Sequence, residues 1–177
     1  RLLWTLDVMG HPDFSLLNGG LHAWANENRK LDSQPTQPVP SNYKPGHTTH
    51  GIADKEYIAQ HLDDSDIKLL DTRTPEEFSG AKKYAERGGH IPHATNMDWI
   101  FAIDQNKNLR LKPDKELRKL LEAQSITQDK EVIVYCQTHH RSSHTYIVLK
   151  HLGYKNLKGY HGAWSDWGND PDVPVES

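Results

Sequence analysis

The run Glu131–Tyr135 holds four consecutive apolar side chains directly before a polar segment that contains the one cysteine of the chain. A short strand with apolar side chains on both faces is typical of a parallel sheet that helices cover on both sides. A second apolar run, Ile67–Leu70, ends at Asp71 in the same manner. The pattern predicts an α/β fold with a mostly parallel central sheet flanked by helices.

Three segments carry the signals of helices. Thr74–Glu77 is a capping box with proline at the first helical position. Leucines spaced by three and four residues follow Pro113, and a further apolar stripe ends at Gly153, a residue type that often terminates helices. The apolar positions of these last two helices are Leu117, Leu120, Leu121, Thr145, Val148, Leu149 and Leu152. Strands and helices therefore alternate in the second part of the chain.

The composition excludes several classes of protein. Lys and Arg number 21 against 24 Asp and Glu, so a net charge of -3 predicts neither nucleic acid nor an anionic membrane as partner. No apolar stretch approaches the roughly 18 residues that cross a bilayer. A single cysteine, Cys136, excludes an intrachain disulfide and predicts a reducing compartment, the cytoplasm.

Two segments of the chain are similar to each other. Gly10–Trp24 and Gly153–Trp167 align without a gap 143 positions apart, with glycines and a tryptophan at matching places. Each is expected to form a helix, a glycine turn, a short strand, a second glycine turn and a helix. Four prolines between residues 35 and 45 indicate an extended linker. We therefore divide the chain into the end of a first unit (1–34), a linker (35–49) and a second unit (50–177).

Twelve histidines raise the question of a metal site. His140 and His144 are four residues apart and can share one face of a helix. The acidic residues near the histidines stand at no ligand spacing, and no His-Glu-x-x-His pattern occurs. We therefore expect no metal centre.

The segment between the central strand and the next helix carries the chemistry. It consists of Cys136, Gln137, Thr138, His139, His140 and Arg141. Ligands bind at such carboxyl ends of parallel strands, and the N–H groups of a tight loop with the positive end of a helix stabilise an anion there. Arg141, with His139 and His140, adds cations, and these surroundings favour the thiolate, which is the nucleophilic form. A small buried apolar role for the cysteine is the alternative, but the polar loop favours catalysis.

Four blocks of the sequence resemble, in content and order, the signature blocks of the rhodanese superfamily. They are Asp71–Phe78, Gly89–Ala94, Cys136–Arg141, and Gly162–Gly168 with Pro174–Glu176. The sequence after the cysteine is similar to that of bacterial tandem-domain thiosulfate sulfurtransferases, in which a silent domain precedes an active one. By this resemblance, residues 1–34 are the C-terminal remnant of a non-catalytic rhodanese-like domain, and residues 50–177 are the catalytic rhodanese domain.

The resemblance implies a sulfurtransferase without a cofactor. Cys136 would attack the outer sulfur of thiosulfate, release sulfite, and pass the sulfur of the resulting persulfide to cyanide or a thiol, including a thiol on an acceptor protein. The amides of Gln137–Arg141 would bind the substrate anion and the persulfide.

Two positions depart from the family pattern. His93 stands where the family usually has glycine, so we expect an altered turn. Glu77 falls where some animal rhodaneses have a thiosulfate-binding arginine, which leaves the preferred donor open. Asp71 and Arg73, at the end of the neighbouring strand, are either supporting site residues or a buried structural ion pair.

Two other functions stay open. Phosphatases and arsenate reductases of related fold also hold a cysteine in a strand-loop-helix turn. They have five residues between cysteine and arginine, whereas four separate Cys136 from Arg141, and the shorter loop favours a bound sulfur atom. A persulfide carrier or binding module loaded by another protein would need the same cysteine.

Overall fold

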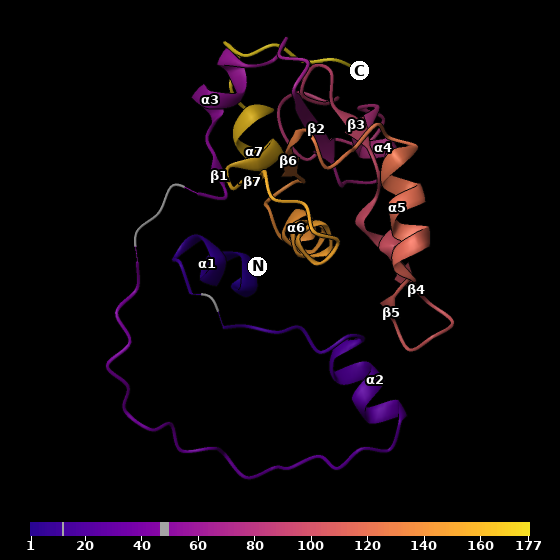
Figure 1. The fold of residues 1–177 in the computed structure, drawn as a ribbon. Coiled ribbons are helices and arrows are strands. Elements are labelled where there is room, and N and C mark those ends of the chain that lie inside the picture. The colour runs from indigo at the N-terminus through magenta and orange to yellow at the C-terminus, as the bar shows by residue number, and fades with distance from the viewer. Residues whose placement is uncertain (12, 47–49) are drawn as a thin grey trace.

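The computed structural model describes residues 1–11, 13–46 and 50–177, and its centre is a five-stranded sheet (Figure 1). The strands are β1 (Ile52–Ala53), β2 (Ile67–Asp71), β3 (Thr95–Asn96), β6 (Glu131–Tyr135) and β7 (Leu157–Tyr160). Their order is β1-β7-β6-β2-β3, and every pair in it is parallel. β6 is the central strand, because β7 pairs with one of its edges and β2 with the other. The predicted α/β fold with a parallel sheet is confirmed.

Helices connect the strands and cover both faces of the sheet. They are α3 (Lys55–Gln60), α4 (Pro75–Phe78), α5 (Asp114–Glu122), α6 (Arg141–His151) and α7 (Ala163–Trp167), with a 3-10 helix η1 (Trp99–Ala102) and an antiparallel ribbon of β4 (Ile103–Asp104) and β5 (Arg110–Leu111). The predicted capping box is present at α4, where the side chains of Thr74 and Glu77 each accept a hydrogen bond from the other residue's backbone N–H. Gly153 follows α6 with a φ of 86°, which agrees with its predicted role in ending that helix.

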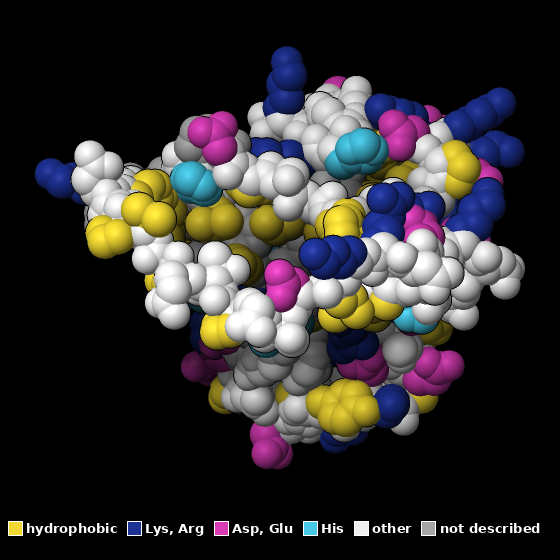
Figure 2. All heavy atoms as spheres, turned by 90° about the horizontal axis from the view of Figure 1, so that it is seen from below, with side chains coloured by type: hydrophobic (Ala, Val, Ile, Leu, Met, Phe, Trp, Pro, Cys, Tyr) yellow, Lys and Arg dark blue, Asp and Glu magenta, His cyan; other side chains and the backbone are white. Residues whose placement is uncertain are grey.

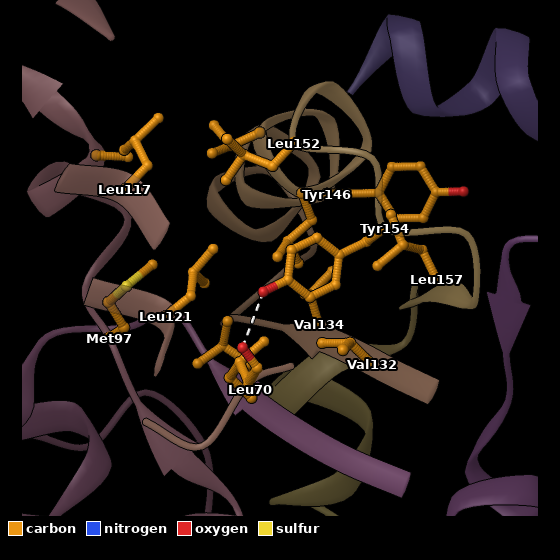
Figure 3. Close-up of a cluster of buried hydrophobic side chains, with 14 of the residues drawn as sticks. Leu70, Met97, Leu117, Leu121, Val132, Val134, Tyr146, Leu152, Tyr154 and Leu157 are labelled. Carbon is orange, nitrogen blue, oxygen red and sulfur yellow. Dashed lines mark hydrogen bonds between the residues drawn. The ribbon is translucent and has the colours of Figure 1, made fainter. Parts of the chain in front are cut away.

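Alternate residues of β6 belong to two separate cores. Val132 and Val134 pack with residues of α5 and α6, and Figure 3 shows Leu70, Tyr146 and Leu152 in this cluster. The dashed line in Figure 3 is the hydrogen bond that Tyr154 Oη donates to the carbonyl of Ile126, at 2.8 Å. Ile133 and Tyr135 face the other side of the sheet.

The second core lies under α3 and α7. There Ile133 and Tyr135 meet Ile58, Trp164 and Trp167, all nearly inaccessible to solvent. Full burial of each such aliphatic side chain contributes about 1.5–3 kcal/mol to the free energy of unfolding. Burial on both faces is the physical reason why the central strand has no alternation of polar and apolar residues.

Two helices precede the linker, α1 (Leu2–Val8) and α2 (Gly20–Asn26). α1 packs against α6, where Asp7 accepts a hydrogen bond from Tyr146 Oη at 2.8 Å and pairs with Lys150 Nζ at 2.7 Å. α2 lies beside the β4–β5 ribbon, where Glu27 pairs with Arg110 at 2.5 Å. Both helices therefore contact the second unit.

The two similar sequence segments share helix boundaries. α1 and α6 end 143 positions apart, at Val8 and His151, and α2 and α7 begin 143 positions apart, at Gly20 and Ala163. Gly20 and Ala163 have the same left-handed φ of 57°. The short strand predicted between α1 and α2 is wrong, because residues 13–17 form no strand. These residues lie outside the sheet, and a strand needs a hydrogen-bonded neighbour.

Residues 35–46 form neither helix nor strand and run as a long extended connection (Figure 1). The rest of the predicted linker, 47–49, lies outside the described residues.

Seen from the side of α1 and α2, the surface carries several patches of hydrophobic side chains between charged ones (Figure 2). The large hydrophobic side chains exposed on residues 1–34 are Leu2, Leu16, Leu17, Leu21 and Leu31. Over the described ranges, no helix has the length and apolar character needed to span a membrane.

Candidate active site

Cys136 stands directly after β6, at the carboxyl end of the central strand, and only 1% of it is exposed. Its carbonyl oxygen accepts a hydrogen bond from the N–H of Trp164 at 2.9 Å. The carbonyl of Gln137 accepts one from the N–H of Ser165 at 3.0 Å. These two bonds turn the first carbonyl oxygens of the loop toward α7. The start of α7 therefore sets the orientation of the loop backbone.

His139 points into the protein and is fully buried. Its φ of 60° lies in the left-handed region, and its Nδ1 is 2.8 Å from the hydroxyl of Ser142. Burial, reinforced by nearby positive charges, lowers the pKa of His139 to about 3. The ring is thus neutral at pH 7, and the expectation that His139 supplies a cation is wrong. A sequence alone does not tell which of two adjacent histidines faces the interior.

The other predicted loop residues lie nearer to solvent. Thr138 and His140 are exposed, and Thr138 Oγ1 is 3.2 Å from His140 Nδ1. Gln137 is half-buried and donates a hydrogen bond from Nε2 to the carbonyl of Tyr84 at 3.1 Å. The loop is therefore tied to the segment that follows α4, a contact that the sequence did not predict.

Arg141 is the first residue of α6 and pairs with Glu77 of α4. Its two terminal nitrogens donate hydrogen bonds of 2.6 and 2.7 Å to the two carboxylate oxygens. The bond to Glu77 raises the pKa of Arg141 above its ordinary value, with smaller contributions from the side chain of Cys136. Burial raises the pKa of Glu77, but the bonds from Arg141 and the Thr74 backbone outweigh it, so this pKa lies below its ordinary value. Both groups are therefore charged at neutral pH.

An open hollow of about 460 Å³ adjoins the loop. It is lined by Thr74, Glu77, Lys82, Tyr84, Gln137 and Arg141. The Lys82 ammonium lies 5.1 Å from the ring centroid of Tyr84, and the hydrogen bond with Tyr84 raises the pKa of Lys82. Lys82 and Tyr84 were missed in the sequence because they fall between two signature blocks. Their only signal is a polar segment between Gly80 and Gly88.

Asp71 and Arg73 form a buried ion pair of 2.5 Å. Arg73 also donates to the carbonyl of Gly89 at 2.7 Å, and its guanidinium lies 4.5 Å from the ring centroid of Trp164. Neither residue is among those that line the hollow. This geometry favours the structural interpretation, in which the pair holds the loop after β2 against α7.

The turn at His93 has a φ of 63°, the left-handed region that favours glycine. The backbone N–H of His93 donates a hydrogen bond to the carboxylate of Glu176 at 3.1 Å.

Among residues 1–11, 13–46 and 50–177, no group of three or more His, Cys, Asp or Glu side chains is arranged to hold a metal ion.

A buried cysteine at the end of a central parallel strand, followed by a tight loop and a helix, defines the class as an α/β protein with a cysteine loop at the strand end. The chain belongs to the rhodanese-like domain family, whose family model matches residues 54–170. It is 44% identical over 176 residues to a thiosulfate sulfurtransferase of Pseudomonas aeruginosa and 43% identical over 178 residues to one of Azotobacter vinelandii. Each alignment covers 99% of this chain and 64% of the relative, so the chain spans under two thirds of their length.

Two further similarities are to a sulfur carrier protein and to the solved structure of a biosynthetic enzyme. The chain is 36% identical over 185 residues to the sulfur carrier protein TtuD of Thermus thermophilus, which covers 97% of this chain and 64% of that protein. The structure of an anaerobic ergothioneine biosynthesis enzyme from Chlorobium limicola matches all of this chain and 44% of its own, with a TM-score of 0.90 and 23% identity. At that identity the second similarity shows the fold alone.

Proposed function

We propose that this chain transfers the outer sulfur of thiosulfate, through a persulfide on Cys136, to cyanide or a thiol acceptor. The observation that carries the proposal is the orientation of the loop after β6. Hydrogen bonds from the N–H groups of Trp164 and Ser165 hold the carbonyls of Cys136 and Gln137 toward α7. That orientation leaves the N–H groups of residues 137–141 to stabilise negative charge at the sulfur. The names of the relatives that are 43–44% identical support the same donor.

The reaction takes two displacements. The Cys136 thiolate attacks the outer sulfur of thiosulfate, a sulfur–sulfur bond forms, the bond to the sulfite group breaks, and sulfite leaves with the electron pair. Cyanide then attacks the terminal sulfur of the persulfide, thiocyanate forms, and the thiolate is restored. With a thiol acceptor the second product is the persulfide of that acceptor. No external oxidant or reductant is consumed in either displacement.

The charges around the hollow support an anionic donor. Arg141 and Glu77 largely offset each other, so the remaining positive charge comes from the ammonium of Lys82 and the N-terminal end of α6. Only 1% of Cys136 is exposed, which limits the access of large groups to its sulfur.

Intact mass measurement tests the proposal. Incubation with thiosulfate should add the mass of one sulfur atom to the protein and release one equivalent of sulfite, and cyanide should remove the added sulfur. The Cys136→Ser variant should show neither event. Release of phosphate from an aryl phosphate serves as the comparison reaction, and phosphate release without a sulfur adduct would favour the phosphatase alternative.

A second candidate is a sulfur carrier that is loaded by another protein. The relative named sulfur carrier protein TtuD supports it. Turnover separates the two candidates. A sulfurtransferase forms many equivalents of thiocyanate from thiosulfate and cyanide, whereas a carrier gives at most about one equivalent unless a loading protein is present.

A reactive thiol is best preserved in a reducing compartment, which supports the cytoplasm as the location of this chain. In that compartment the acceptor would be a cellular thiol or a protein thiol.

We also propose that residues 1–34 are the end of a preceding, non-catalytic rhodanese-like domain, residues 35–49 the linker and residues 50–177 the catalytic domain. The shared helix boundaries of α1 and α2 with α6 and α7 support this division. The structure of a longer protein in which further residues precede this sequence tests it. α1 and α2 should complete a second domain that is folded like residues 50–177, and an unrelated fold there would contradict the division.

A further inference from the structure

Helix α1, which precedes the linker, lies against the cysteine loop. The ring centroids of Trp4 and His139 are 4.4 Å apart, with the ring planes at 76°, and only 6% of Trp4 is exposed. The side chain of Arg1 donates a hydrogen bond to the carbonyl of Thr138 at 2.7 Å. Thr138 and His139, two consecutive residues of the loop, are therefore both contacted by the N-terminal segment, which is more than 130 positions away in the sequence.

The space around the His139 ring is filled on a further side by the backbone of β7. A Cβ atom placed on Gly159 would lie 2.5 Å from the His139 ring and 2.8 Å from Trp4 Nε1. Such distances are too short for carbon and nitrogen atoms that are not bonded to each other, so only glycine leaves room for both rings. Trp4, His139 and Gly159 thus form one packed unit beneath the loop.

Trp4 is itself held in place. Its Nε1 donates a hydrogen bond to the carbonyl of Gly51 at 3.1 Å. One turn later, Asp7 anchors α1 to α6 through Tyr146 and Lys150. The indole of Trp4 is fixed by its own hydrogen bond, and its helix is fixed by the contacts of Asp7. Trp4 is therefore a rigid support for the neighbouring ring of His139.

His139 needs such support because its backbone is in the left-handed region, at a φ of 60°. Residues other than glycine keep this conformation only where their surroundings enforce it. We propose that Trp4 is a positioning residue for the cysteine loop, and that it holds the N–H groups of the loop in the orientation that stabilises negative charge at Cys136. The segment before the linker is then part of the catalytic unit and not only the end of another one.

Alkylation of Cys136 by iodoacetamide between pH 5 and pH 10 tests this inference without any sulfur donor, because the chain has a single cysteine. The variants are Trp4→Leu and Trp4→Phe in the full chain, each measured well below its melting temperature. In Trp4→Leu the pH profile of alkylation should move upward by about one pH unit, since loosened N–H groups stabilise the thiolate less. Trp4→Phe, which keeps a ring beside His139, should move it by about half as much.

Trp24→Leu is the matched control. Trp24 lies on α2 in the same N-terminal segment, and its Nε1 donates a hydrogen bond to the carbonyl of Lys30 at 2.9 Å and not to a residue of the loop. This variant should lower the melting temperature and leave the alkylation profile unchanged. An unchanged profile in every Trp4 variant that folds would overturn the inference, as would an equal shift in Trp24→Leu. Because alkylation needs no thiosulfate, this result is independent of whether the proposed donor is right.

Discussion

The guanidinium of Arg141 is clamped by the carboxylate of Glu77 through two hydrogen bonds of 2.6 and 2.7 Å, at the edge of the hollow beside Cys136. The two residues come from the starts of two different helices, α6 and α4. Glu77 also completes the capping box with Thr74, so the pair links the cysteine loop to the end of β2. A donor anion therefore competes with a carboxylate for the same guanidinium.

The Glu77→Gln variant should bind an anionic donor more tightly. Loss of one negative charge beside the donor leaves the charge of Arg141 unopposed, while the amide can still accept from the Thr74 backbone. The KM for thiosulfate should fall by roughly 3- to 10-fold in steady-state kinetics, which corresponds to about 0.7–1.4 kcal/mol. The melting temperature should also fall, because the partly buried Arg141 loses its charged partner.

Glu76→Gln is the control for this change. Glu76 is the neighbouring acidic residue in the first turn of α4, and it is exposed. Its removal should leave the KM within about twofold, because exposed charges are screened by solvent. A higher KM in Glu77→Gln would mean that the carboxylate holds Arg141 in the orientation that binds the donor.

Lys82 should contribute to donor capture. Its ammonium borders the hollow, so Lys82→Ala should raise the KM for thiosulfate by roughly 3- to 10-fold with little change in kcat, and the effect should shrink at high salt. Lys83→Ala removes an equal charge from the next residue, which is exposed and does not line the hollow. Equal effects of the two substitutions would show that only the overall charge matters.

Buried His139 should make the protein less stable in mild acid. The pKa of its imidazole is about 3 in the folded protein and 6.5 in the unfolded chain, so below pH 6.5 only the unfolded state takes up the proton. Folding stability therefore falls as the pH drops from 6.5 toward 3, and the part due to His139 is about 2 kcal/mol at pH 5.

Urea unfolding at pH 7.5 and pH 5 measures this loss. The variant His139→Asn should show about 2 kcal/mol less dependence on pH than the natural sequence. Asparagine is a suitable replacement because it tolerates a left-handed φ and does not titrate. An unchanged pH dependence in His139→Asn would show that the ring is accessible to protons in the folded state.

The His93→Gly variant should be more stable than the natural sequence. His93 has a φ of 63°, and glycine adopts this conformation without the steric cost that other residues carry, about 1 kcal/mol. The ring pairs with Asp63 at 3.3 Å, but both side chains are largely exposed, so this contact contributes little. Thermal unfolding should show a rise in Tm of a few degrees for His93→Gly and no rise for His93→Ala, which keeps the strain.

Local patterns determined much of this protein before any contact was known. The apolar run Glu131–Tyr135 predicted a central strand of a parallel sheet, and Thr74–Glu77 predicted a capped helix, because the cause of each feature lies within a few neighbouring residues. The place of Cys136 at the end of the strand follows from the same local rules.

Tertiary structure alone decided the electrostatics and the support of the loop. The partner of Arg141 is 64 positions away, and the partner of His139 lies in α1, before the linker. No periodicity or short motif encodes such pairs, since they depend on how separate helices pack on the sheet. For the same reason His139 and His140 are equivalent in the sequence, whereas in the fold one is buried and neutral and the other is exposed. The prediction of a short strand between Gly10 and Gly19 is wrong for the converse reason. Residues 13–17 pair with no strand of the described ranges, and a segment suited to a strand stays irregular without such a partner.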